Sequence, residues 1–359
     1  MAQFGEYARH KYFNHKRTSS DPALTSSYAA TFEFQLECEQ SSQVLRKDWE
    51  NIEELYTQAD LRRVCSADPT SAASTCCDHI SWVIWDVYRD GVSKTGGTSY
   101  PDVFSGHLGL LLSRGQTKPT VITTNYDLVV EAALSRASIP FYYPGFRAPS
   151  RSERRPLQLV QELGTERETE GEGIPMIKLH GSVNWFALGD KWYCSMATER
   201  KDELKAVSNP AVSRNQILDD VQAMEPSVDR TTIRPAIIPP MLGKSSESPV
   251  IAHQWRAAMD AIARAKQMFV IGYSFPETDL FMSRLLVDGL HRNRDLSNIF
   301  VADLGSIELW TPKLKRLFNP VFLEKKLRFV CGRTPFLTGL LNGIPPTRFL
   351  DKAQAIPSG

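Results

Sequence analysis

Short apolar runs alternate with amphipathic stretches along the last two thirds of the chain. Runs that end at polar residues or glycine lie at 119–123, 174–179, 268–271, 298–303 and 327–330, and a further short strand at 232–240 is closed by two prolines. Such runs are typical of strands that are buried in a parallel sheet. Helical spacing of apolar residues follows or precedes them at 128–134, 250–266 and 280–290. The alternation predicts an α/β fold with a doubly wound, Rossmann-like parallel sheet.

The first third of the chain has a helical pattern instead. Apolar residues recur at three-, four- or seven-residue offsets over 28–64, and further apolar helices are expected at 76–88 and 101–112. We therefore predict a mainly helical subdomain formed by about residues 28–112. Trp82 and Trp85 are expected to pack in its core rather than to stack on bases.

The remaining segments are more polar. We expect a helix at 156–163, a polar insertion at about 186–230 that is irregular apart from a helical patch, and a disordered tail at 351–359. Residues 1–350 would then form one domain with a helical subdomain, which suits a chain of this length.

Composition excludes several classes of protein. The net charge is +1 and 42% of the residues are hydrophobic, so the composition does not indicate binding to nucleic acid or to a membrane. There is no run of about 18 apolar residues and no apolar core in the first 20 residues, so a cytoplasmic location is expected. None of the six cysteines forms a Cys-x-x-Cys pair. We predict free, mostly buried thiols and no metal.

Candidate chemistry begins at the end of the 174–179 run. His180 follows that run directly, and Gly181 allows the backbone to turn tightly. Ligands of open α/β sheets bind outside the carboxyl ends of the strands, where His180 would lie. The alternative is a histidine that only caps a strand and bonds a nearby carbonyl.

Two further strand ends carry polar residues. Thr124, Asn125 and Asp127 follow the 119–123 run; Asp127 has a second explanation as the N-cap of the next helix, whereas Asn125 precedes the cap. Gly272 and Ser274 follow the 268–271 run, where backbone amides and a hydroxyl could hold phosphate or ribose oxygens. Asp303 ends the next strand, a place where carboxylates accept hydrogen bonds from ribose hydroxyls.

In combination these stretches resemble a known family. Residues 123–127 (TTNYD), 178–182 (KLHGS) and 271–275 (IGYSF), in this order, resemble the SIR2-like family. They are most similar to its bacterial branch of NAD-degrading anti-phage defence proteins. Residues 51–55 (NIEEL) and 332–336 (GRTPF) are also similar, so the resemblance covers about residues 45–340.

The resemblance implies roles for these positions. His180 and Asn125 match the catalytic histidine and asparagine, and Asp127 matches an acidic residue near the nicotinamide carboxamide. The resemblance also implies a cofactor-contacting turn at Gly272 and Ser274. With Thr124, Gly181 and Asp303 at the neighbouring strand ends, these are the residues expected to bind NAD, which would be the substrate.

The chain departs from the family at two points. Sirtuin deacetylases carry a four-cysteine zinc module soon after the histidine, and this sequence has none. The family also opens with a glycine-rich strand and turn, whereas Gly5 is the only glycine before Gly91. We therefore expect the first glycine-rich strand to be missing, with Met1 an internal methionine of a longer protein. An unfilled position beside the 119–123 strand and weak NAD binding would follow.

Three functions remain open from the sequence. The first is an NAD glycohydrolase that releases nicotinamide and ADP-ribose as an anti-phage, abortive-infection effector. The second is an NAD-dependent protein deacylase, and the third is a catalytically silent interaction subunit. The resemblance implies control by assembly, as a homo-oligomer or with a separate HerA-like ATPase or Argonaute-type partner. A motor would be a separate chain because no Gly-x-x-x-x-Gly-Lys-Ser/Thr motif occurs.

Overall fold

The computed structural model gives the fold for part of the 359-residue chain. It describes residues 8–9, 12, 21–41, 52–65, 72–89, 119–146, 157–160, 173–189, 191–195, 214–224, 226–227, 229–238, 249–273, 275, 279–303, 307–331 and 354–355. The expected helices at 101–112 and after 335, and the NIEEL and GRTPF stretches at Asn51 and 332–336, lie wholly or partly outside the described residues.

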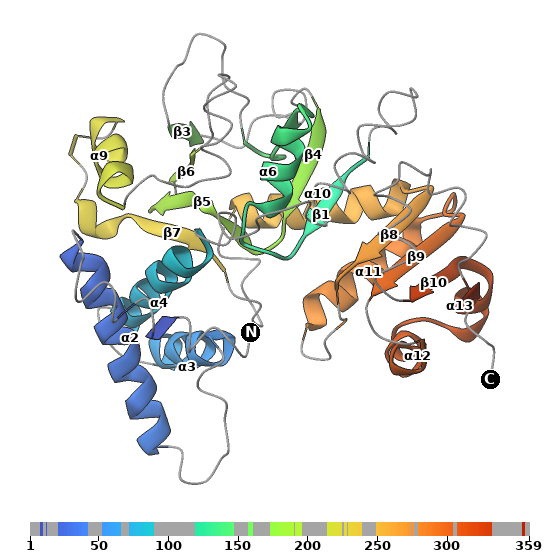
Figure 1. Cartoon of the computed structure of the whole chain (residues 1–359), viewed down its shortest axis with the longest axis horizontal. Coiled ribbons are helices and arrows are strands. Elements are labelled where there is room, and N and C mark those ends of the chain that lie inside the picture. Colours follow the sequence, from blue (N-terminus) through green and yellow to red (C-terminus); the bar gives the residue numbers. More distant parts are fainter. Residues whose placement is uncertain are drawn as a thin grey trace.

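Three helices lie together at one end of the molecule, within the stretch predicted to form a helical subdomain (Figure 1). They are α2 (Pro22–Ser41), α3 (Ile52–Cys65) and α4 (Ala72–Arg89). Both α2 and α3 pack against α4, whose apolar side chains lie in the centre of this core. Trp82 and Trp85 are 4% and 2% exposed, which confirms that they pack in the core.

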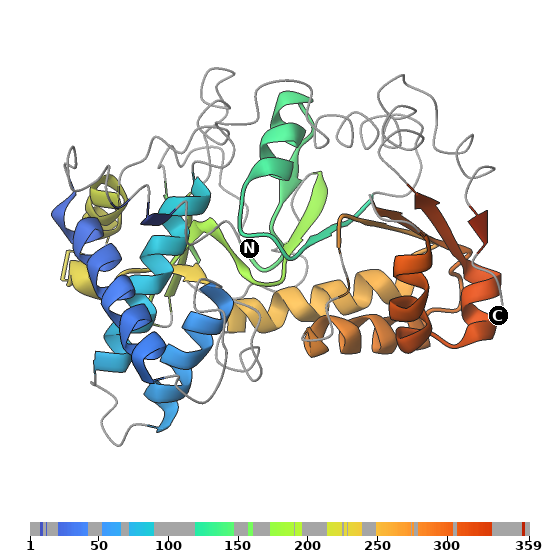
Figure 2. The same cartoon turned by 60° about the horizontal axis from the view of Figure 1, so that its bottom comes forward.

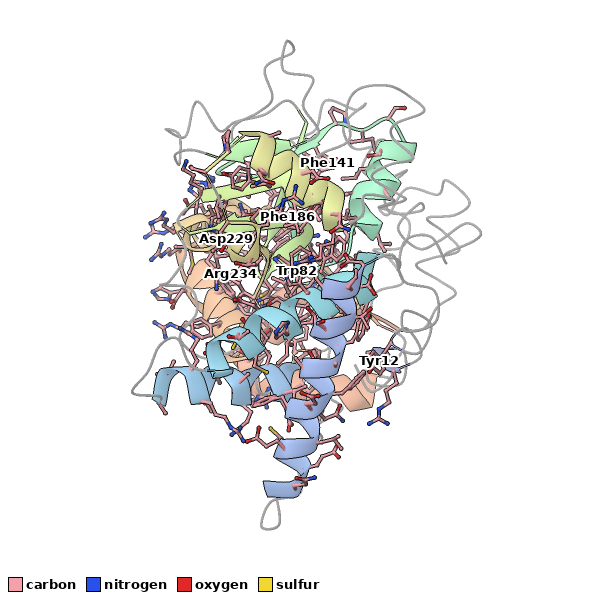
Figure 3. The ribbon with its side chains drawn as sticks, turned by 90° about the vertical axis from the view of Figure 1, so that its left-hand side faces the viewer. Tyr12, Trp82, Phe141, Phe186, Asp229 and Arg234 are labelled. Atoms are coloured by element: carbon pink, nitrogen blue, oxygen red, sulfur yellow. The ribbon has the colours of Figure 1, made fainter. Side chains whose placement is uncertain are left out.

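An antiparallel sheet lies beside the helical subdomain. Its strand order is β3 (Leu157–Val160), β6 (Lys191–Ser195), β5 (Gly181–Leu188) and β7 (Arg234–Ile237). The indole Nε1 of Trp85 donates to the carbonyl of Val183 at 2.9 Å and so joins α4 to β5. Trp82 of α4 also lies near Phe186 of β5, with ring centroids 6.4 Å apart (Figure 3).

This sheet corrects two expectations. The 156–163 stretch contains strand β3 rather than a helix, and the expected irregular insertion contains β6 and the end of β5. Both strands are short; β3 pairs with the distant β6, and β6 also pairs with β5, the strand that precedes it. The expected helical patch is present as α9 (Arg214–Met224), followed by a 3-10 turn at Arg230–Thr232.

A small parallel sheet follows in the middle of the molecule. Its order is β1 (Val121–Thr123), β4 (Ile174–Lys178) and β2 (Phe141–Tyr142), and all its pairs are parallel. Helix α6 (Val129–Arg136) follows β1, as its apolar spacing predicts. The strand that delivers His180 therefore lies at the centre of this sheet.

A second parallel sheet lies at the other end of the molecule (Figure 1). Its order is β8 (Gln267–Ile271), β9 (Asn298–Asp303), β10 (Leu327–Cys331) and the antiparallel β11 (Gln354–Ala355). Its helices are α10 (Pro249–Arg264), α11 (Leu280–Arg292), α12 (Ile307–Leu317) and α13 (Pro320–Lys326). Two residues of the expected disordered tail thus form β11.

The two parallel sheets share a layer of helices. Helix α10 runs along both of them in two views (Figures 1 and 2) and packs against α11. Gly289 allows this close approach, because a Cβ there would lie 2.6 Å from Cγ2 of Ile262. Ile177 and Leu179 at the end of β4 belong to the same buried cluster as Ile299 of β9.

The α/β class with parallel strands is confirmed, but one continuous doubly wound sheet remains a prediction. Among the described residues β1 pairs only with β4, and β8 pairs only with β9. Strands β1 and β8 are therefore edge strands of their sheets in this part of the chain. No helix of the described residues is long and apolar enough to cross a membrane.

Candidate active site

His180 lies in the tight turn between β4 and β5. The turn begins as an extension of the sheet, since Leu179 N donates to the Thr123 carbonyl at 3.1 Å. It is then fixed to β7 because Ile238 N donates to the His180 carbonyl at 2.8 Å. Gly181 has a φ of +80°, and a Cβ on it would lie 1.9 Å from the Ala236 carbonyl oxygen. Only glycine fits there, so the sequence signal at this position is a steric requirement.

The side chain of His180 is enclosed by aromatic rings. It is 6% exposed, with its ring centroid 6.5 Å from that of Tyr126 and 5.8 Å from that of Trp255. Trp255 is itself fixed, because its Nε1 donates to the Leu179 carbonyl at 3.0 Å. The imidazole is therefore held in one place and largely shielded from water.

The loop that carries Asn125 is attached to the histidine turn. The Tyr126 carbonyl accepts from Val183 N at 3.0 Å and from the Ser182 hydroxyl at 3.4 Å. Asn125 N donates to the Thr123 hydroxyl at 3.1 Å, and the residue itself is exposed. The structure thus brings the first two sequence stretches together, with Asn125 open to solvent and to any ligand.

Asp127 has the structural role that its position predicts. Its Oδ1 accepts from Val129 N at 3.1 Å, where α6 begins. The residue is only partly buried, as is Thr124. Its carboxylate therefore stabilises the start of α6, a role that is compatible with contact to a ligand.

The helix that follows the third stretch, α11, reaches the same region through Trp255. Phe281, in the first turn of α11, lies 5.9 Å from the Trp255 ring, which also contacts His180. Gly272 is exposed and has a φ of +66°, and no atom of the described residues beyond its chain neighbours lies within 4 Å of the position a Cβ would take. Among the described residues, the turn after β8 therefore leaves space in front of Gly272.

The side chains of two predicted binding residues lie outside the described part of the structure. Ser274 lies outside the described residues. Asp303 ends β9, where it pairs with Cys331 of β10, but its side chain lies outside the described part. Asp279, in contrast, caps α11, because its Oδ1 accepts from Met282 N at 3.0 Å.

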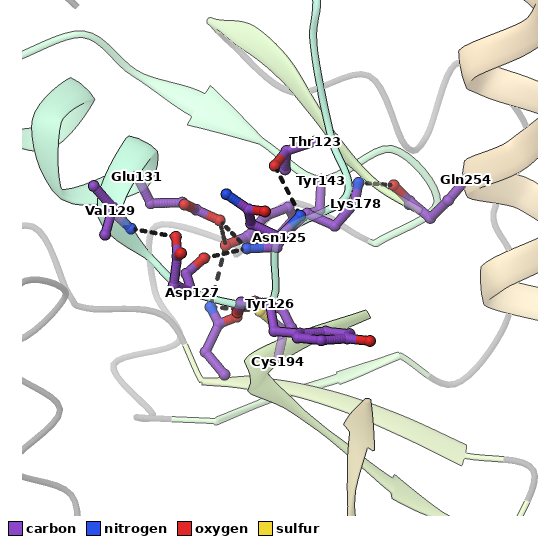
Figure 4. Close-up of polar contacts among 12 residues, drawn as sticks. Thr123, Asn125, Tyr126, Asp127, Val129, Glu131, Tyr143, Lys178, Cys194 and Gln254 are labelled. Carbon is purple, nitrogen blue, oxygen red and sulfur yellow. Dashed lines mark hydrogen bonds and ion pairs between the residues drawn. The ribbon is translucent and has the colours of Figure 1, made fainter. Parts of the chain in front are cut away.

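A buried polar network behind the site has no counterpart among the predicted site residues (Figure 4). The ammonium of Lys178, 0% exposed, lies 2.8 Å from Oε1 of Glu131 and 2.5 Å from the Asp127 carbonyl oxygen. The Tyr143 hydroxyl donates to Glu131 at 3.1 Å and accepts from the Asn184 amide at 3.2 Å. The available signal was a lysine inside an otherwise apolar strand.

Burial also determines the state of the thiol beside this network. The surroundings of Cys194 raise the pKa of its thiol well above the usual range, mainly by burial and secondly through Glu131. Cys194 is thus a neutral thiol and not a nucleophile. Cys38, Cys76 and Cys77 are also buried and Cys65 is exposed, all free, as the sequence predicts. No group of three metal-ligating side chains occurs within the described residues.

Comparison with known proteins agrees with this arrangement. The family model for the SIR2-like domain matches residues 119–298, just over half of the chain. The chain belongs to the SIR2-like family. A search of curated proteins found no match. The matched region of this SIR2-like protein includes β1, the His180 turn, Trp255 and the turn at Gly272.

Membership of the SIR2-like family indicates NAD-related chemistry and an enzyme. The expected roles of His180, Asn125 and Asp127, and the NAD contacts of Thr124, Gly181, Gly272, Ser274 and Asp303, remain predictions. The described residues fit NAD to this extent: Asn125 is exposed in a loop that is bonded to the turn of His180, and no described atom beyond the chain neighbours fills the Cβ position at Gly272.

Proposed function

We propose that this SIR2-like protein is an NAD glycohydrolase that cleaves the bond between nicotinamide and ribose. The observation that carries the proposal is the joining of the Asn125 loop to the His180 turn through the Tyr126 carbonyl. An exposed amide and an enclosed imidazole on adjacent turns provide one group to orient a polar ligand and one to accept a proton.

The reaction needs little acid catalysis. The nicotinamide ring of NAD is a cation that leaves as a neutral molecule, and the ribose passes through an oxocarbenium-like state. Water then forms the new bond at the anomeric carbon and loses a proton. The products are nicotinamide, ADP-ribose and one proton, so the site has to orient the ribose, limit access of water and accept that proton.

His180 is the proposed base. An ordinary histidine titrates near neutrality and can take a proton from water or from a ribose hydroxyl. Tyr126 and Trp255 hold its ring, which reduces the reorganisation needed before proton transfer. Asn125 is proposed to hold the attacking water and the ribose hydroxyls, and Asp127 to lie near the carboxamide.

The sequence that follows His180 disfavours the deacylase alternative, because it lacks the zinc module of the sirtuin deacetylases. Only Cys194 and Cys331 occur after His180, so no four-cysteine zinc module can form there. Cys194 is also buried within the β5–β6 pair.

Incubation with NAD tests the proposal. Nicotinamide and ADP-ribose should appear in equal amounts without any added peptide. Acceleration that depends on an acyl-lysine peptide would instead identify a deacylase. A folded protein that consumes no NAD in any oligomeric state would refute the glycohydrolase and favour a silent interaction subunit.

We further propose that the enzyme acts in the bacterial cytoplasm as an anti-phage effector. The resemblance of the three stretches to NAD-degrading defence proteins supports this. Because such an activity would kill the cell, it would be controlled by assembly, as a homo-oligomer or with a motor ATPase or Argonaute-type partner. Cells that express the protein should form fewer phage plaques and lose NAD after infection, and cells with the His180→Ala variant should do neither.

A further inference from the structure

We propose that Lys178 and Glu131 are positioning residues that hold the Asn125 loop in its active arrangement. The inference rests on the proposed function for its catalytic half. The anchoring of the loop stands on the buried ion pair and can be measured independently of activity.

The ion pair joins the two elements that carry the proposed catalytic residues. Lys178 is the last residue of β4, two positions before His180. Glu131 lies in the first turn of α6, two positions after Val129. The N–H of Val129 donates to the capping carboxylate of Asp127. The 2.8 Å contact between them therefore ties the histidine strand to the helix that follows the Asn125 loop.

The ammonium also holds the loop directly. Besides Glu131 it donates to the backbone carbonyl of Asp127 at 2.5 Å. With the Tyr126 carbonyl bonded to Val183 and Ser182, two consecutive carbonyls of the loop are bonded to the segment 178–183. Asn125 is itself exposed, so its placement depends on these backbone anchors.

The surroundings indicate that the pair serves geometry more than stability. Both side chains are buried, at 0% and 1% exposure, and two buried charges lose their hydration. Replacing a buried ion pair by apolar residues of similar size often leaves the stability of a protein unchanged. A buried pair such as this one is therefore best explained by its geometry, because it selects one arrangement of the segments that it joins. Tyr143, Asn184 and the Gln254 carboxamide, which accepts from Lys178 N at 3.1 Å, keep the network in that arrangement.

The test uses a charge-neutral pair variant, Lys178→Met/Glu131→Gln. The glutamine keeps an acceptor for the Tyr143 hydroxyl, while the donor to the Asp127 carbonyl is lost. Lys178→Met alone would leave a buried carboxylate without its cation and is expected to fold poorly. Tyr28→Phe is the matched control, because it removes a buried hydrogen bond to Asp86 in the helical subdomain.

Two readouts separate positioning from stability. In the pair variant, amide hydrogen exchange at residues 124–128 should become about tenfold faster while that of β9 is unchanged, since only the loop anchor is lost. The kcat for NAD loss should fall roughly 10- to 100-fold, as for a misplaced catalytic group. Tyr28→Phe should lower the melting temperature and leave both the exchange at 124–128 and kcat unchanged.

Each outcome is decisive. Unchanged exchange at 124–128 in the pair variant overturns the anchoring role. Faster exchange with an unchanged kcat overturns the positioning role, since the enzyme then does not need the ordered loop. A wild-type protein without NAD consumption refutes the glycohydrolase instead, and the exchange measurement still determines whether the pair anchors the loop.

Discussion

His180 is held by Tyr126 and Trp255 and has its carbonyl fixed by Ile238, so its backbone position does not depend on the imidazole. The His180→Ala variant should therefore fold and lose at least about 100-fold in NAD hydrolysis, the effect typical of a lost general base. Nicotinamide release measures the loss. His291→Ala, which removes an exposed histidine at the end of α11, should leave the rate unchanged. Activity within a few-fold of wild type for His180→Ala would limit the histidine to a structural role.

Asn125 and Asp127 should differ in their effect on stability. Asn125 is exposed, so Asn125→Ala should reduce NAD hydrolysis without lowering the melting temperature. Asp127 also caps α6, so Asp127→Ala should reduce activity and cost about 1 kcal/mol of stability. Thermal melting and nicotinamide release of both variants check this. An unchanged melting temperature for Asp127→Ala would contradict the capping role.

At the residue scale the sequence predicted the polar strand ends but not what holds them. His180, Asn125 and Gly181 follow directly from apolar runs that stop, because a buried strand must end where polar side chains begin. The contact between Lys178 and Glu131 could not be predicted, because it joins residues of β4 and α6 that are 47 positions apart in the sequence. The role of Trp255 could not be predicted either, since the sequence does not distinguish a tryptophan at a binding site from one that packs in the core of an amphipathic helix.

At the scale of elements, the two glycine turns have different physical requirements. Gly181 has both a positive φ and a backbone oxygen 1.9 Å from any Cβ, whereas Gly272 has a positive φ and open space. Gly272→Ala should therefore cost only about 1 to 2 kcal/mol, the penalty for a left-handed residue. Its methyl group would point into the space proposed for NAD, so the KM should rise. Gly181→Ala should be much less stable than Gly272→Ala.

Denaturant unfolding of both variants measures this difference. Equal losses of unfolding free energy would contradict the close contact at Ala236. A KM for NAD that is unchanged in Gly272→Ala would remove the turn after β8 from the binding site.

Helices with strong periodicity and strands that are continuous apolar runs were predictable, whereas strands that mix polar and apolar residues were not. Helices α4, α10 and α11 and strands β1, β8 and β9 match their sequence patterns closely. Strand β3, at Leu157–Val160, was expected to be helical, and β6 was not expected at all. These two strands stabilise each other through antiparallel pairing, so neither has a strong local signal of its own.

At the scale of the whole molecule, sequence alone predicted parallel strands, but neither the antiparallel sheet of β3, β6, β5 and β7 nor how the strands divide into sheets. Sheet order depends on pairings between distant segments, for which apolar periodicity carries no information. The described residues place three parallel strands on each side of an unjoined boundary between β1 and β8. The shared cluster of Ile177, Leu179 and Ile299 shows that the two sheets nevertheless belong to one core.

The open edge of β8 has a measurable consequence. Strand β8 pairs only with β9 among the described residues, whereas β9 lies between β8 and β10. Successive amides of a strand point to opposite sides, so about half of the β8 amides should lack a sheet partner and exchange rapidly. The apolar residues 268–271 are only half-buried, which leaves these amides accessible to water. The amides of β9 should be protected along the whole strand, because both of its edges are paired.

Residue-resolved hydrogen exchange by NMR distinguishes alternating from uniform protection. Uniform protection of β8, equal to that of β9, would mean that another segment covers this edge in solution and that the two parallel sheets are continuous.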